Sequence, residues 1–115
     1  MDNYNAKRLE NRILEAVNTL IVSGEIKNPA LSRFASATDV QLSKDNSFAR
    51  IYVSCLEDNR LEKSVAALQS AAGFIQARLA KILKTRNTPR LVFEVDTTQR
   101  EAARVNDLLE SIKDE

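Results

Sequence analysis

The spacing of apolar residues near the N-terminus predicts an amphipathic helix. Five of them recur three or four positions apart, which places them on one side of a helix. They are Leu9, Ile13, Val17, Leu20 and Ile21. Gly24 follows as a stop signal. Asn28-Pro29 then marks a loop, because the residue before a proline is pushed out of helical geometry.

The next two segments alternate between apolar and polar positions, which is typical of a β-hairpin with one buried face. The polar run Ser43-Lys44-Asp45-Asn46 between them indicates the turn. The inward-facing set is Val40, Leu42, Ala49, Ile51, Val53 and Cys55. Arg50 and Tyr52 point the other way. For these two we favour an ordinary outward strand face over stacking on unpaired RNA bases.

The region after the hairpin predicts two helical stripes that are out of phase across Ser70-Ala71-Ala72-Gly73. The first stripe consists of Leu61, Val65, Leu68 and Ala72, and the second of Ile75, Leu79, Ile82 and Leu83. A glycine between two stripes permits a kink and a close backbone approach. We expect Asn59 to form a capping box with Glu62 at the first stripe, and Phe74 to anchor in the core.

A third strand and a last helix complete the pattern. Thr88-Pro89 ends the helical region, and Leu91, Phe93 and Val95 then alternate with polar or smaller residues. Thr98 with Glu101 has the spacing of a capping box. The order predicts an α+β fold with a three-stranded sheet and helices on one face. We expect a single domain over residues 1–115, with a core at about 6–96 and a C-terminal helix at about 98–112.

The charge of the chain is unevenly distributed, although its net value is only +1. Residues 1–62 carry 8 basic and 9 acidic side chains, residues 63–93 carry 6 and none, and residues 94–115 carry 3 and 7. The basic residues of the middle block are Lys63, Arg78, Lys81, Lys84, Arg86 and Arg90. Such a distribution lets one face bind a polyanion while the total charge stays small.

Several classes of chemistry lack the residues that they need. The chain has no histidine, a single cysteine (Cys55) and two isolated glycines. The commonest general base and metal ligand, an internal disulfide and a glycine-rich phosphate loop are therefore missing. We expect no enzymatic activity, no catalytic residue, and no bound metal or cofactor. No apolar run reaches the ~20 residues of a membrane span and no signal peptide is visible, so we expect a soluble cytoplasmic protein.

The basic block is the candidate binding surface. Like charges repel, so a helix with only structural roles would normally intersperse acidic residues, and their absence favours contact with phosphates. The alternative is a solvated helix face. The proposed RNA-binding residues of the block are Arg78, Lys81, Lys84, Arg86 and Arg90. A second contact is expected from the first helix, through Lys7, Arg8 and Arg12.

Four stretches between about Lys7 and Leu109 together resemble the ribosome-binding factor A family, which are bacterial small-subunit maturation factors. The first is Arg12-Ile13-Leu14 with Glu25-Ile26-Lys27-Asn28-Pro29. The second is Thr38-Asp39-Val40-Gln41-Leu42-Ser43-Lys44-Asp45, running into Ala49-Arg50-Ile51-Tyr52-Val53-Ser54. The third is Leu68-Gln69-Ser70-Ala71-Ala72-Gly73-Phe74-Ile75 with Arg78-Leu79. The fourth is Arg86-Asn87-Thr88-Pro89-Arg90-Leu91-Val92-Phe93-Glu94-Val95-Asp96. Their order and spacing are specific.

The resemblance implies a KH-like type II fold, α-β-β-α-kink-α-β. In this family Ala71-Ala72-Gly73 matches a kink that replaces the GXXG loop with which KH domains grip single-stranded nucleic acid. It also implies that the protein binds the immature small (30S) ribosomal subunit and assists late maturation and processing of 16S rRNA, without nucleotide hydrolysis. We expect a monomer, with small-subunit proteins as further candidate contacts.

Two alternatives remain open at this stage. One is a generic KH-like binder of single-stranded RNA, and the other is a protein-interaction module with a basic docking face. If about five phosphates are contacted, log K should fall with log salt at a slope of roughly −3.5 to −4.5.

Overall fold

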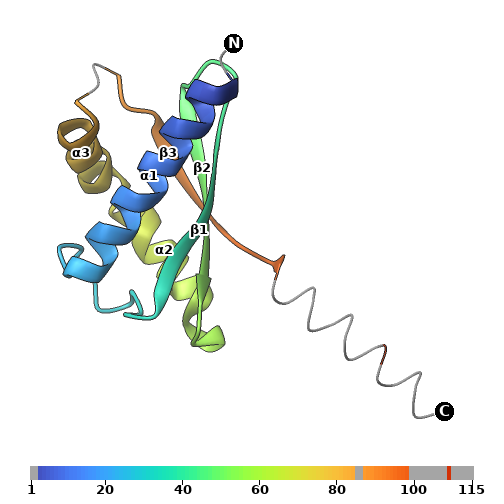
Figure 1. Ribbon diagram of the computed structural model, residues 1–115. Helices are drawn as coiled ribbons and strands as arrows, with labels where there is room; N and C mark the ends of the chain where they lie inside the picture. Colours follow the sequence, from blue (N-terminus) through green and yellow to red (C-terminus); the bar gives the residue numbers. More distant parts are fainter. Residues whose placement is uncertain (1–2, 85–86, 99–108, 110–115) are drawn as a thin grey trace.

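The computed structural model describes residues 3–84, 87–98 and 109 of the chain. The elements are shown in Figure 1. They are α1 (Asn3–Ser23), β1 (Ala35–Leu42), β2 (Phe48–Cys55), the short 3₁₀ helix η1 (Asp58–Arg60), α2 (Leu61–Ser70), α3 (Ala72–Leu83) and β3 (Arg90–Val95). The predicted succession from the first helix to the third strand is confirmed. The helix expected at about 98–112 lies outside the described residues, apart from positions 98 and 109.

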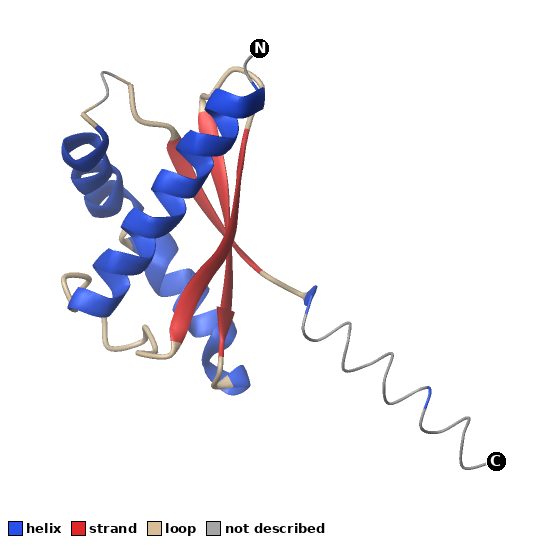
Figure 2. Ribbon diagram, in the orientation of Figure 1, coloured by secondary structure: helices blue, strands red, loops and turns tan. Residues whose placement is uncertain are grey.

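The three strands form one sheet in the order β1-β2-β3. Strand β1 is antiparallel to the central strand β2, whereas β3 is parallel to it. A parallel neighbour requires a long crossover, which η1, α2 and α3 provide. The helices α1, α2 and α3 all lie on one face of the sheet (Figure 2). The predicted α+β fold with helices on one face is therefore confirmed.

The core lies between the sheet and these helices. Every second residue of β2 points inward, and Ala49, Ile51 and Val53 have no exposed surface. The helices meet them with the buried residues Ile13, Val17, Leu20, Leu68, Ile75 and Leu79. The inward set predicted for the hairpin is thus confirmed, except that Leu42 is only half-buried.

The break between α2 and α3 lies at Ala71. This residue has φ −93° and ψ 7°, and its N–H donates to the carbonyls of Ala67 and Leu68 at 3.1 and 3.0 Å. The new helix begins directly afterwards, since the Ile75 N–H donates to the Ala71 carbonyl at 2.9 Å. Gly73 lies inside α3 without a positive φ, so the chain turns at an alanine and not at the glycine.

Three local predictions were wrong. Asn59 lies inside the 3₁₀ turn that leads into α2, and Arg60 occupies the N-cap with no side-chain hydrogen bond. Ile82 is 44% exposed and Phe74 is 45% exposed. The buried stripe of α3 is Ile75, Leu79 and Leu83, at strict four-residue spacing. Because the buried stripe follows this spacing, Ile82 and Phe74 point away from the core.

Candidate nucleic-acid interface

Helix α3 carries its basic residues on the side opposite its buried stripe. Lys81 is exposed on the last turn of the helix. Lys84 follows as the C-cap in the left-handed conformation, with φ 55°, and its N–H donates to the Ala80 carbonyl at 3.0 Å. Positive charge at this end of a helix is favoured by the partial negative charge of the free carbonyls. Both lysine side chains are thus exposed to solvent at the C-terminal end of α3.

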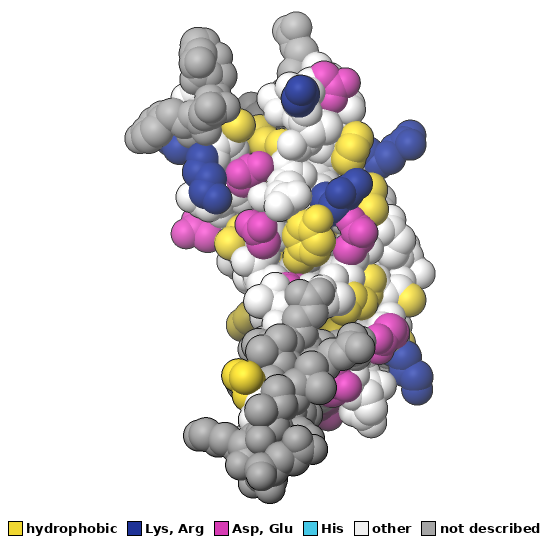
Figure 3. All heavy atoms as spheres, turned by 90° about the vertical axis from the view of Figure 1, so that its right-hand side faces the viewer, with side chains coloured by type: hydrophobic (Ala, Val, Ile, Leu, Met, Phe, Trp, Pro, Cys, Tyr) yellow, Lys and Arg dark blue, Asp and Glu magenta, His cyan; other side chains and the backbone are white. Residues whose placement is uncertain are grey.

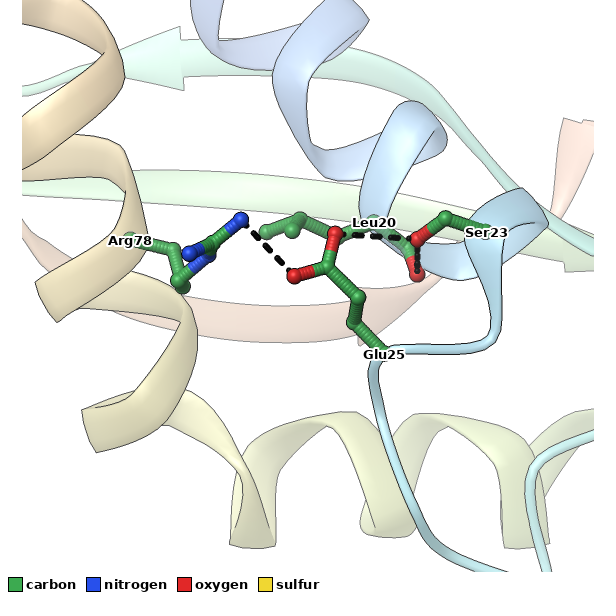
Figure 4. Close-up of polar contacts among 4 residues, drawn as sticks. All are labelled: Leu20, Ser23, Glu25 and Arg78. Atoms are coloured by element: carbon green, nitrogen blue, oxygen red, sulfur yellow. Dashed lines mark hydrogen bonds and ion pairs between the residues drawn. The ribbon is translucent and has the colours of Figure 1, made fainter.

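Arg78 is held by an acidic residue from another element (Figure 4). Its Nη2 lies 2.7 Å from Oε1 of Glu25, which follows α1 in the loop toward β1. The other oxygen of Glu25 accepts a hydrogen bond at 3.1 Å from the Ser23 hydroxyl, and that hydroxyl also lies 3.1 Å from the Leu20 carbonyl. The basic block lacks an acidic partner in sequence, but the fold supplies one for Arg78.

Arg90 is separated from the basic residues of α3. It begins β3, and its N–H donates to the Ser47 carbonyl at 3.0 Å. Its side chain is exposed and alternates with buried Leu91, so it belongs to the outer face of the sheet, whereas α3 covers the inner face. Arg86 lies outside the described residues. Of the predicted residues of the block that the structure describes, Arg90 therefore lies on a different face of the molecule from Arg78, Lys81 and Lys84.

Helix α1 contributes one basic residue close to α3. Arg12 lines an open groove of about 370 Å³ together with Thr19 of α1 and Ile82 of α3. Glu15 lines the same groove. The exposed side of Ile82 therefore forms part of the floor between the two helices. Arg12 therefore lies beside α3, with Glu15 in the same groove, and the two contacts that the sequence predicted separately come from neighbouring helices.

Lys7 and Arg8 occupy the first half of α1 and are exposed. Lys7 lines an open hollow of about 640 Å³ between α1 and the β1–β2 turn, where Lys44 lies as well. Glu10 stands beside them, and its Oε2 accepts a hydrogen bond from the Leu42 N–H at 2.9 Å. Lys7 thus faces the hairpin turn, at a different place from the groove that Arg12 lines.

The outer face of the sheet carries a balanced set of charges. The Nε of Arg50 lies 2.7 Å from Oε2 of Glu94. A side-chain hydrogen bond with Tyr52, and then the charge of Glu94, raise the pKa of Arg50. From this side of the molecule, dark blue and magenta side chains alternate around apolar ones (Figure 3). Arg50 is engaged within the sheet, as expected for an ordinary strand face.

Sequence reasoning missed the exposed ring of Phe74. Phe74, Arg78 and Lys81 follow one another at i, i+4 and i+7, so they form one stripe along α3. This spacing is visible in the sequence. Phe74 was predicted to be buried because it is apolar. The change of phase around Gly73 did not show where the second helix begins, so the pattern did not show which face of that helix Phe74 occupies.

The described residues show little that points to other chemistry. Within residues 3–84, 87–98 and 109, no group of three His, Cys, Asp or Glu side chains is placed to hold a metal ion. Cys55 is buried. Among the same residues, no helix has both the length and the apolar character that a membrane crossing requires.

Comparison with sequence families gives one clear match. The family model described as ribosome-binding factor A matches residues 5–109. Ribosome-binding factor A of Clostridium botulinum (strain Loch Maree / Type A3) is 36% identical over 115 residues, which cover 99% of this chain and 95% of the relative. The protein of the same name from strain Eklund 17B is 34% identical over 116 residues, with 99% of each chain covered.

Solved structures give the same result. The crystal structure of ribosome-binding factor A from Thermus thermophilus has a TM-score of 0.69 and 29% identity, over 78% of this chain and 93% of that one. The solution structure of a Thermotoga maritima protein, described as a putative ribosome binding factor A, has a TM-score of 0.68 and 29% identity, over 79% and 86%. A homology model of the Thermus protein fitted into the cryo-EM map of a 30S–RbfA complex has a TM-score of 0.65 and 29% identity, over 78% and 93%. The predicted KH-like fold is confirmed.

Proposed function

Since the chain belongs to the ribosome-binding factor A family, as its sequence motifs predict, we propose that it is a ribosome assembly factor that binds the immature small subunit. It assists late maturation and processing of 16S rRNA in the cytoplasm. It acts as a monomeric single domain over residues 1–115, without enzymatic activity or a cofactor. The fitting of a similar protein into a map of a 30S complex supports this partner.

The observation that supports the proposal is a set of exposed basic residues at the end of α3 and on the neighbouring helix α1. Lys81 and Lys84 project from the last turn of α3, and Arg12 of α1 lines the groove between the two helices. Point charges of this kind neutralise phosphates and carry little base information. The protein therefore recognises the shape of an rRNA junction more than its sequence. It holds or displaces an rRNA helix during assembly and leaves as the subunit matures.

The remaining basic residues have different roles in this proposal. Arg78 is already paired with Glu25, so it neutralises a phosphate only when that pair opens. Arg90 lies on the outer face of the sheet, and Lys7 and Arg8 on the first half of α1. Arg90, Lys7 and Arg8 therefore contact rRNA at places separate from Lys81, Lys84 and Arg12, and Arg86 is a further proposed contact.

Charge reversal at one position of α3 tests the proposal. Lys81→Glu should weaken binding to purified 30S subunits at every salt concentration and should flatten the plot of log K against log salt by about one to two units. Lys63→Glu is the matched control, because Lys63 is an exposed lysine of the same acid-free block but lies on α2, before the kink. Equal affinities and slopes for the two variants would contradict the proposed surface.

The cellular partner is tested by sedimentation of a lysate through a sucrose gradient. The protein should co-migrate with free small subunits and be absent from translating ribosomes. A generic single-stranded RNA binder would instead bind short free oligonucleotides tightly. A protein-interaction module would keep its complex after nuclease treatment. Either of these results, without co-migration, would refute the assembly role.

A further inference from the structure

Phe74 exposes an aromatic ring on the helix that carries the basic surface. It lies in the first turn of α3 and is 45% exposed. A large aromatic side chain in water gives up much of the free energy that its burial would provide. The neighbouring Ile75 is completely buried, so the helix does have an inward-facing position at this point. The ring is therefore free to contact a partner.

The ring lines a cleft at the junction of three elements. The cleft has a volume of about 350 Å³. One wall is the loop after α1, one is the end of α2, and the third is the start of α3. The lining residues are Glu25, Ile26, Lys27, Asn28, Ser70, Ala71 and Phe74. Ligand sites combine apolar and aromatic side chains with a few polar groups, and this lining has Ile26, Ala71 and Phe74 beside its polar residues.

The charges around the cleft favour an anionic partner. Lys27 forms part of one wall and is exposed. Arg78 and Lys81 continue the stripe that Phe74 begins on α3. The single carboxylate in the lining, Glu25, is already paired with Arg78 at 2.7 Å. A ring that leads into a row of cations suits a nucleotide, whose base is flat and whose phosphate is charged.

The backbone next to the ring is also accessible. Gly73 is exposed, and a Cβ placed on it would have no atom within 4 Å. A nucleic-acid strand can therefore approach the start of α3 without meeting a side chain at this position.

We propose that Phe74 and this cleft form a stacking site for one unpaired nucleobase of the RNA that the basic surface binds. The base lies against the phenyl ring, and its flanking phosphates face Lys27 and Lys81. Stacking on an aromatic ring tolerates any base, because every base has a π-face. The inference rests on the proposed function, since the RNA is the one held by α3. It adds a contact to an unpaired base that phosphate neutralisation alone does not provide.

Substitution of the ring separates stacking from charge. Phe74→Leu keeps an apolar side chain but removes the aromatic face, whereas Phe74→Tyr keeps that face. Phe34→Leu is the matched control, because Phe34 is 49% exposed and precedes β1, away from the cleft lining. Affinity for purified 30S subunits is measured for all three at several salt concentrations. Thermal unfolding verifies that each variant is folded.

We expect Phe74→Leu to bind about 5- to 150-fold more weakly, the range for one base stacked on an aromatic ring. Its salt slope should match that of the unaltered protein, because stacking releases no counterions. Phe74→Tyr and Phe34→Leu should bind with nearly unchanged affinity. Unchanged affinity of Phe74→Leu, together with weaker binding of Lys81→Glu, would refute the stacking site and leave the proposed function intact. Failure of the unaltered protein to bind subunits would refute the proposed function itself.

A photo-crosslinking residue at position 74 identifies what the ring touches. Benzoylphenylalanine in place of Phe74 should crosslink to 16S rRNA at a nucleotide that chemical probing shows to be unpaired. The same residue in place of Phe34 should not crosslink to that nucleotide. A crosslink from position 74 to a ribosomal protein, or to a base-paired helix, would overturn the inference.

Discussion

Asn18 and Gln69 each hold one edge strand of the sheet, because each side-chain amide donates one hydrogen bond to the strand's backbone and accepts another. The Asn18 side chain donates to the Ala37 carbonyl at 3.0 Å and accepts from the Ala37 N–H at 2.7 Å. The Gln69 side chain donates to the Leu91 carbonyl at 3.2 Å and accepts from the Phe93 N–H at 2.8 Å. Edge strands present unpaired backbone groups. Two amides, one on α1 and one on α2, satisfy such groups on β1 and β3.

Removal of the Gln69 amide should therefore destabilise the fold. Gln69→Ala leaves a carbonyl and an N–H of β3 without these partners in a partly buried place, which should cost about 1–3 kcal/mol. Gln76→Ala is the control, because the Gln76 amide makes no hydrogen bond with another described residue and lies on the neighbouring helix. Urea unfolding followed by circular dichroism measures both. A Gln69→Ala loss no greater than that of the control would show that the two bonds contribute no net stability.

The ion pair between Glu25 and Arg78 should restrain RNA binding more than it stabilises the fold. Both side chains are over one third exposed, so Glu25→Gln should change the free energy of unfolding by less than about 1 kcal/mol. The substitution releases Arg78 toward solvent, where it can neutralise a phosphate. Affinity for 30S subunits should rise, and the salt slope should steepen by up to about one unit.

The control for this variant removes the same charge elsewhere. Asp39→Asn removes a carboxylate of β1, which belongs to the exposed outer face of the sheet. Its effect on subunit affinity should be smaller, because the screening length of about 8–10 Å limits the effect of a distant charge. Equal gains for the two variants would mean that total charge, and not the release of Arg78, controls the affinity.

The strands and helices could be predicted because one-sided burial leaves a periodic signal. Ile51 and Val53 alternate with outward residues, and Ile13, Val17 and Leu20 follow helical spacing. The burial of such positions depends only on the type of the element and on which of its faces is buried, so it can be predicted from one segment of sequence. The sequence order of the elements then restricted the fold to a few arrangements.

The features that were missed depend on two elements at once. Glu25 and Arg78 are far apart in sequence, so only the packing of the loop after α1 against α3 makes them partners. Phe74 and Ile75 are both apolar, so the sequence does not show which of them is buried. The rotation of α3 against the sheet buries Ile75 and leaves Phe74 exposed. Arg90 belongs to the basic block in sequence, but its strand places it on the outer face of the sheet, away from α3. Charge patterning alone contains none of this information.

Asp45 should make the β1–β2 turn sensitive to acid. Its Oδ1 accepts from the Ser47 hydroxyl at 2.7 Å, the Ser47 N–H at 3.0 Å and the Ser43 hydroxyl at 2.8 Å. These bonds, led by the Ser47 hydroxyl, lower the pKa of Asp45 from 3.8 to about 2. A lowered pKa means that the folded state favours the ionised form. The stabilisation is therefore complete above about pH 4 and is lost as the pH falls toward 2.

The carboxyl carbon of Asp45, followed by NMR, should titrate near pH 2. The difference in Tm between the unaltered protein and Asp45→Asn should shrink as the pH is lowered from 5 to about 2. Asp39→Asn, which removes a carboxylate from the neighbouring strand, provides the comparison. A titration of Asp45 near its ordinary value would show that the three hydrogen bonds do not persist in solution.

The two glycines of the chain should respond to alanine in opposite directions. Gly24 has φ +76°, a conformation that costs a residue with a Cβ about 1–2 kcal/mol, so Gly24→Ala should lower the free energy of unfolding by that amount. Gly73 lies in α3 without a positive φ, and nothing stands near its missing Cβ. Gly73→Ala should therefore raise the stability by about 0.4–1 kcal/mol, because alanine has fewer conformations to lose on folding.

This contrast allows the structural and binding roles of Gly73 to be separated. A variant that is more stable but binds 30S subunits more weakly would show that the glycine is needed where RNA approaches the backbone, since the fold itself does not require it. Unfolding in urea and subunit affinity, measured on the same preparations of Gly24→Ala and Gly73→Ala, give both quantities. Destabilisation by Gly73→Ala would contradict the geometry of the kink, in which Ala71 makes the turn and Gly73 is an ordinary helical residue.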